Sequence, residues 1–163
     1  LFLCNVDEDS VREGNEYSKR VEALAKTLEA STLNISVSIE QELSEISDEN
    51  ELKEFLFEMG MESTGLEKLI KTGYDLLGLC TYFTSGPKET RAWTITNSTF
   101  APEAAGKIHT DFKKGFIRAE TVSYSDFVSA GGWLKAKELG NVRSEGKDYL
   151  VKDGDIMNFL FSS

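Results

Sequence analysis

A change of hydrophobic period at Gly78 constrains the fold of this 163-residue chain more than any other feature. Before Gly78, apolar residues recur at the three- and four-residue spacing of one helix face, at Leu66, Leu69, Ile70, Tyr74 and Leu77. After it, Cys80–Thr84 and Thr90–Ile95 are strand-like and flank the turn sequence Ser85-Gly86-Pro87-Lys88. We therefore predict two domains, one covering residues 1–79 and the other residues 80–163.

The charges divide at the same place. The whole chain has 28 acidic and 18 basic residues; residues 80–163 hold 10 and 11 of these, which leaves 18 and 7 for residues 1–79. The first part should repel nucleic acid, whereas the second is nearly neutral and can present a local basic patch.

Residues 1–79 have the pattern of an open α/β domain. Residues 1–5 form an apolar run typical of a strand buried in a parallel sheet, and the segment from Tyr17 to Leu28 has helical spacing. Leu33, Ile35 and Val37 alternate with polar residues, which predicts a second strand. These elements predict a right-handed βαβ unit, followed by helices. In the last of these helices, Thr64 and Glu67 form a capping box at the start, and Gly78 is placed to end it.

Residues 80–163 have a different order of elements. Pro102 opens a helix whose buried face is Ala101, Ala104, Ala105, Ile108 and Phe112, and residues 116–122 form a strand. Tyr149–Val151 and Ile156–Phe161 flank Asp153-Gly154, which predicts a closing hairpin. Hairpin, helix, strand and hairpin is the order of a β-grasp (ubiquitin-like) α+β fold.

The loop after the first strand carries residues suited to ligand binding. In an open parallel sheet, ligands bind beyond the carboxyl ends of strands, where we place Asn5. Glu8, three residues later, can accept hydrogen bonds from a base edge, and Ser36, Val37 and Ser38 can offer backbone N–H groups to the same ligand. An acidic surface loop explains the same residues and remains an alternative.

Several segments resemble the Obg-like (YchF-type) P-loop ATPases. That family has N-x-x-E, here Asn5 to Glu8, where ordinary GTPases have N-K-x-D. Further similar segments are 73–77, 81–84, 91–94, 104–112, 114–119, 145–149 and 151–155, and Ile108-His109-Thr110-Asp111 also resembles TGS domains of other families. The resemblance implies that residues 1–79 are the carboxy-terminal part of a P-loop nucleotide-binding domain and residues 80–163 a TGS domain.

The resemblance also implies roles for individual residues. Asn5 would position the base-binding loops, Val6 would pack on the base, and Glu8 would favour adenine, with Ser36 and Val37 in the second base loop. ATP, or GTP, and Mg²⁺ would be the ligands of the intact parent. No G-x-x-x-x-G-K-[S/T] motif occurs in the chain, so we expect no catalytic residue, no metal ligand and no tightly bound cofactor here.

A basic cluster is the candidate partner site. We expect Lys113, Lys114 and Arg118 to contact RNA or the ribosome, with Arg118 on the same strand face as the Phe116 ring. The alternative is a solvated face paired with Asp111 and Glu120. No membrane or DNA partner is expected.

Two separated cysteines and the absence of a long apolar run favour a cytoplasmic protein. A chain beginning at Leu1 inside an apolar run looks like part of a longer protein. Two rival functions stay open: a module that binds RNA or protein without nucleotide, and a TGS domain that mainly covers the nucleotide-binding domain of its own chain.

Overall fold

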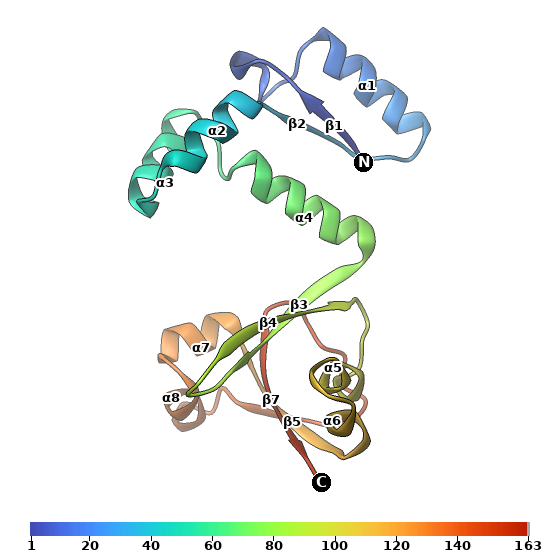
Figure 1. Cartoon of the computed structure of the whole chain (residues 1–163), viewed down its shortest axis with the longest axis vertical. Helices are drawn as coiled ribbons and strands as arrows, with labels where there is room; N and C mark the ends of the chain where they lie inside the picture. The colour runs from blue at the N-terminus through green and yellow to red at the C-terminus, as the bar shows by residue number, and fades with distance from the viewer. Residues whose placement is uncertain (163) are drawn as a thin grey trace. The chain divides into compact units, whose positions relative to one another are not determined.

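The computed structural model describes residues 1–162 and divides into two compact units, Leu1–Leu76 and the chain from Leu77 onward (Figure 1). The elements of the first unit are β1 (Phe2–Asn5), the 3₁₀ turn η1 (Glu8–Ser10), α1 (Glu16–Thr27), β2 (Thr32–Ile35), α2 (Val37–Glu45), α3 (Glu49–Glu58) and α4 (Gly65–Leu77). The second unit contains β3 (Leu79–Ser85), β4 (Thr90–Thr96), α5 (Ala101–Ile108), α6 (Thr110–Lys114), β5 (Phe116–Ser123), α7 (Tyr124–Ala130), α8 (Trp133–Glu138), β6 (Arg143–Glu145) and β7 (Asp155–Phe161).

The first unit begins with the predicted βαβ arrangement. Strands β1 and β2 pair in parallel from Phe2↔Thr32 to Asn5↔Ile35, and α1 connects them. The Asn15 side chain caps α1 by accepting the N–H groups of Tyr17 and Ser18, which satisfies donors that the first helical turn leaves without partners.

The predicted extension of the second strand to Val37 is wrong. Strand β2 ends at Ile35, and Ser36 is the residue that precedes α2. The apolar face that continues is helical, because Ile39 and Leu43 are buried in a cluster with Leu56 and Met61. Val37 instead has 54% of its surface exposed.

Helix α4 has the ends that the sequence predicts. At its start, Thr64 N–H donates to Glu67 Oε2 (3.0 Å) and Glu67 N–H donates to Thr64 Oγ1 (3.1 Å), which is a capping box. At its end, Gly78 has a φ of +61°, a left-handed conformation that glycine adopts without a Cβ penalty.

The second unit is a five-stranded mixed sheet with the order β4-β3-β7-β5-β6. Strands β3 and β4 form an antiparallel hairpin, β3 meets β7 in parallel, and β5 is antiparallel to β7 and β6. Helices α5 and α6 lie on one side of the sheet and α7 and α8 on the other (Figure 1).

The core beneath α5 is packed through small residues. Ala101, Ala104 and Ala105 are fully buried, and the Tyr82 hydroxyl donates to the Ala104 carbonyl at 2.8 Å. On the other side of the sheet, Val122 and Ile156 pack with alanines of α7 and α8.

The predicted closing hairpin is wrong, although the Asp153-Gly154 turn is present. Within residues 1–162, Tyr149–Val151 forms no strand with β7; Leu150 makes a single bridge to Phe100. The turn docks on β3 instead, since Thr81 N–H donates to Asp153 Oδ1 and Gly154 N–H donates to the Thr81 carbonyl, each at 2.8 Å. The fifth strand is β6, which pairs with β5.

A buried carboxylate holds the segment before β7. Asp155 is 3% exposed. It accepts the Tyr149 hydroxyl (2.7 Å) and the Lys152 N–H (2.9 Å) on Oδ2 and a guanidinium N–H of Arg143 (3.5 Å) on Oδ1. Burial, together with the hydrogen bond to Asp155, raises the pKa of Tyr149, so the phenol stays protonated and donates.

We expect residues 77–163 to fold when expressed alone, because this unit contains its own sheet and core. Residues 1–76 should be less stable alone, since within the described residues β1 pairs with β2 alone, and Leu3 in this strand and Leu1 just before it remain exposed. The measurement is the dispersion of amide signals in a ¹H–¹⁵N spectrum of each piece. A poorly dispersed spectrum for 77–163 would contradict an autonomous unit.

Candidate functional site

Two loops of the first unit meet at the carboxyl ends of β1 and β2. The Asn5 side-chain oxygen accepts the Val37 N–H at 3.2 Å, and Glu8 Oε1 accepts the Ser38 hydroxyl at 3.0 Å. The hydroxyls of Ser36 and Ser38 lie 2.9 Å apart. The strand-end residues predicted from the sequence are thus joined by side-chain hydrogen bonds across the two loops.

The valines of this site lie differently from one another. Val6 donates its N–H to the Ile35 carbonyl at 2.8 Å and is 8% exposed, so its side chain belongs to the core. Val37, at the start of α2, is exposed and provides the apolar surface of the second loop. Ser38 is expected from the sequence to offer its backbone N–H together with Ser36 and Val37. The bond from its hydroxyl to Glu8, which joins the two loops, is not predicted by the sequence.

The two neighbouring carboxylates of the first loop have different partners. Hydrogen bonding from Ser10, and to a lesser extent from Asn15, lowers the pKa of Asp7, so this charge is held within its own loop. Glu8 reaches the second loop instead, through Ser38. Of the two, Glu8 is therefore the carboxylate that joins the first loop to the second.

A second group of candidate residues lies on α5 and α6. The predicted single helix is two helices, because His109 is extended (φ −158°, ψ 143°) and caps α6 by accepting the Asp111 N–H on Nδ1 at 3.2 Å. This break turns α6 back beside α5 and leaves a hollow of about 640 Å³. The hollow is lined by Glu103, Gly106, Lys107, Thr110, Lys113 and Lys114.

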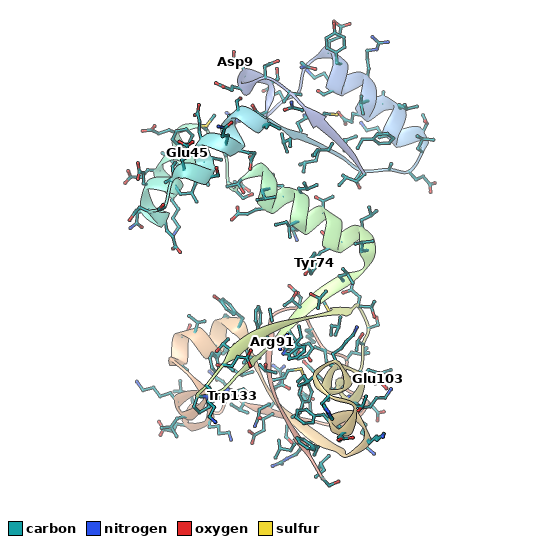
Figure 2. The ribbon with its side chains drawn as sticks, viewed as in Figure 1. Asp9, Glu45, Tyr74, Arg91, Glu103 and Trp133 are labelled. Carbon is teal, nitrogen blue, oxygen red and sulfur yellow. The ribbon has the colours of Figure 1, made fainter. Side chains whose placement is uncertain are left out.

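The charges around this hollow are mostly positive. Lys113 pairs with Glu103 at 3.3 Å, and Figure 2 shows Glu103 on α5. Gly106 allows the close approach of α6, since a Cβ there would come within 3.2 Å of the Lys113 Cβ. Lys107 was not predicted as part of the cluster, because the helix break that brings it to Lys113 and Lys114 depends on the backbone at His109.

The predicted face shared by Phe116 and Arg118 is wrong. A β-bulge between them shifts the register with β7, which leaves Phe116 buried and Arg118 exposed. Arg118 donates to the Ser144 hydroxyl at 3.5 Å. Glu120 is bound by Lys137 at 2.9 Å, and the hydrogen bond from Lys137 lowers the pKa of Glu120.

Comparison with known proteins decides the family. A family profile of YchF GTPase carboxy-terminal regions, described as a protein of unknown function (DUF933), matches residues 79–162. The chain belongs to the YchF family. It is 50% identical over 162 residues to the ribosome-binding ATPase YchF of Escherichia coli O157:H7, and 48% identical over 164 residues to that of Bacillus subtilis. In each case the match covers 99% of this chain and 44% of the relative.

A solved YchF structure has the same fold. The YchF GTPase of Schizosaccharomyces pombe is 32% identical and superposes with a TM-score of 0.79, covering 98% of this chain and 43% of that one. This YchF-family chain thus spans less than half the length of the relatives it matches.

Among residues 1–162, no three or more His, Cys, Asp or Glu side chains are grouped so as to hold a metal ion. No helix in that range has the length and apolar character needed to cross a membrane.

Proposed function

We propose that this chain is the carboxy-terminal part of a cytoplasmic, ribosome-associated NTPase that prefers adenine nucleotides. Residues 1–79 supply the base-recognition loops of its P-loop domain, and residues 80–163 are its TGS domain. The observation that carries this proposal is the pair of bonds Asn5–Val37 and Glu8–Ser38, which brings two loops together at strand ends. The names of the relatives, ribosome-binding ATPases and a GTPase, support it.

The donor set fits a nucleotide base better than a metal. It combines an amide, a carboxylate and hydroxyls from Asn5, Glu8, Ser36 and Ser38 beside the exposed Val37 surface. Bound ATP or GTP, with Mg²⁺, supplies the phosphoanhydride to be hydrolysed. The residues of this chain hold and orient the base. Glu8 accepts a base amine, and the Ser38 hydroxyl keeps that carboxylate facing the second loop.

Glu8→Asp combined with Val6→Lys, made in a full-length protein carrying this segment, should shift the ATP:GTP affinity ratio toward GTP by about tenfold. The change converts N-x-x-E into N-K-x-D, whose shorter carboxylate accepts both N–H donors of guanine; a charge-assisted hydrogen bond is worth about 1.5–3 kcal/mol. Titration calorimetry with each nucleotide measures the ratio. Val6→Lys alone is the control, because Val6 is buried and its replacement affects stability. An unchanged ratio in the double variant would remove Glu8 from the base site.

The strand order of the second unit supports the TGS assignment. A hairpin, a helix packed across the sheet, and a last strand between the first and third strands form the order β4-β3-β7-β5-β6, as in a β-grasp fold. The helices α7 and α8 are an insertion between β5 and β6.

We further propose that Lys113, Lys114 and Arg118 dock this unit on ribosomal RNA. Lys113 and Lys114 on α6 share a hollow with Lys107, and Arg118 on β5 is exposed and reaches Ser144 of β6. These cations belong to a unit whose total charge is close to zero. Contacts with few phosphates imply modest affinity that falls with salt, with a slope of roughly −0.7 to −0.9 per phosphate.

Reversing these charges (Lys113→Glu, Lys114→Glu and Arg118→Glu) should weaken ribosome co-sedimentation of this chain about tenfold or more and flatten its salt dependence. The matched control reverses Lys135, Lys147 and Lys152, which are exposed and lie outside this cluster, and changes the net charge equally. Equal binding by the cluster variant and the control variant, insensitive to salt, would place the docking surface elsewhere.

A further inference from the structure

A groove opens in the second unit where two strands of its sheet separate. Within residues 1–162, β3 and β7 are bridged in parallel at Phe83↔Ile156 and nowhere else, although β7 runs on to Phe161. The end of the β3–β4 hairpin, β7 and the helices α5 and α6 surround a groove of about 560 Å³. This lies within the roughly 300–1,000 Å³ of small-ligand sites.

The hairpin that forms one wall is held in place from outside the groove. Figure 2 shows Trp133 near the end of the hairpin, and its indole N–H donates to the Ser85 carbonyl at 2.8 Å. The indole N–H of Trp93, inside the groove, donates to Thr84 Oγ1 at 2.9 Å. Both bonds favour a groove that is formed before any ligand arrives.

The walls of the groove are aromatic. On the hairpin side, Trp93 is stacked with Tyr82 (6.5 Å between centroids, 13° between planes), and the Arg91 guanidinium lies 4.5 Å above the Trp93 ring. On the other side, Phe112 and Phe161 are stacked at 3.9 Å, and Phe161 remains 37% exposed. Ile108, Met157 and Phe159 add apolar surface, and Asn158 and the residues of the hairpin turn also line the groove.

We propose that this groove receives an unpaired nucleobase of RNA, an inference that rests on the RNA docking proposed above. Flat rings and a guanidinium plane are the surfaces on which extruded bases stack. Lys88 in the lining and Arg91 over the Trp93 ring supply cations for the flanking phosphates; Glu89 is the acidic residue of the lining. Beyond Ile156, β7 forms no further bridge to β3 within the described residues.

This occupant fits the groove better than an extended peptide. A peptide strand added at the β7 edge gains main-chain hydrogen bonds but makes no special use of stacked rings or of the surrounding cations. A nucleotide uses both, because every base has a flat face and every linkage an anionic phosphate.

The test compares an RNA hexamer with a stable abasic analogue of the same length, by fluorescence anisotropy with the 163-residue chain. Stacking of one base should make the ordinary RNA bind about five- to a hundredfold more tightly. Phe161→Leu, which keeps apolar bulk but has no ring, should reduce this difference to near one, and Phe161→Tyr should preserve it. Tyr124→Ala, which removes an exposed ring outside the groove, is the control. Tryptophan emission of the chain should change on binding RNA. Trp133→Phe leaves Trp93 as the remaining tryptophan and also removes the bond to Ser85, so a change that persists in this variant is assigned to Trp93.

The outcomes separate the two proposals. Equal, salt-sensitive affinity for ordinary and abasic RNA would leave phosphate docking intact and overturn the base-binding groove. Absence of binding to either oligonucleotide would overturn both proposals. A response of Trp93 to an uncharged apolar peptide and not to RNA would assign the groove to peptide and overturn this inference.

Discussion

The 163-residue chain is expected to bind ATP with a dissociation constant of about 1 mM or weaker and to hydrolyse none. In P-loop proteins most nucleotide affinity comes from the phosphate cradle and Mg²⁺, and the sequence contains no P-loop motif. In the proposed site, the loops joined by Asn5 and Glu8 would contact only the base, which corresponds to about −4 kcal/mol of binding free energy.

Calorimetric titration of the chain with Mg²⁺-ATP measures this affinity directly. A full-length protein carrying the same segment is the positive control and should bind in the micromolar range, about a thousandfold more tightly. Ser38→Ala in the isolated chain should weaken even the residual binding, because it frees the Glu8 carboxylate from the second loop. Micromolar affinity for the isolated chain would contradict the proposed division of the site.

Replacement of Asp155 by alanine should reduce the free energy of unfolding of the second unit by about 3 kcal/mol. The carboxylate is buried, and its loss leaves the Tyr149 hydroxyl and the Lys152 N–H without an acceptor and Arg143 without one of its two carboxylate partners. Each buried polar group left unpaired costs about 1–3 kcal/mol. The loss is a large part of the roughly 5–15 kcal/mol by which domains are stable.

Urea unfolding followed by Trp fluorescence measures the change. The free energy of unfolding of Asp155→Asn should lie between those of the unsubstituted chain and Asp155→Ala. An amide oxygen still accepts one of these bonds, but the charge facing Arg143 is gone. Asp148→Ala, an exposed carboxylate in the same segment, is the matched control and should change stability by less than about 0.5 kcal/mol. A similar midpoint for Asp155→Ala and Asp148→Ala would show that the network does not hold the segment.

The elements that could be predicted from the sequence are those fixed by neighbouring residues. The capping box of Thr64 and Glu67, the helix end at Gly78 and the helix opened by Pro102 are local, and the structure confirms them. The βαβ unit also follows from short-range pattern. The closing hairpin could not be predicted in this way, because an Asp-Gly turn specifies a chain reversal but not the strand against which the turn packs. Here the turn is hydrogen-bonded to Thr81, which is distant in sequence.

The candidate sites divide in the same way. The convergence of Asn5 and Glu8 on the second loop follows from the rule that parallel strands end at one edge. The bulge that separates Phe116 from Arg118 has no signal in the alternation of β5 residues, since one extra residue reverses every face beyond it. Lys107 lies beside the α6 lysines because the helix breaks at His109. The apolar spacing of the sequence continues across this break, so the sequence alone predicts one helix.

The alanines on the buried face of α5 set the distance between this helix and the sheet, and with it the width of the groove. Ala101, Ala104 and Ala105 have no exposed surface, so the distance from α5 to the sheet is fixed by methyl groups. A larger residue at any of these positions would lift the helix, and with it Ile108, which lines the groove. In the proposed site, substitutions at these alanines are therefore expected to change which ring fits between the aromatic walls, although no ligand would touch them.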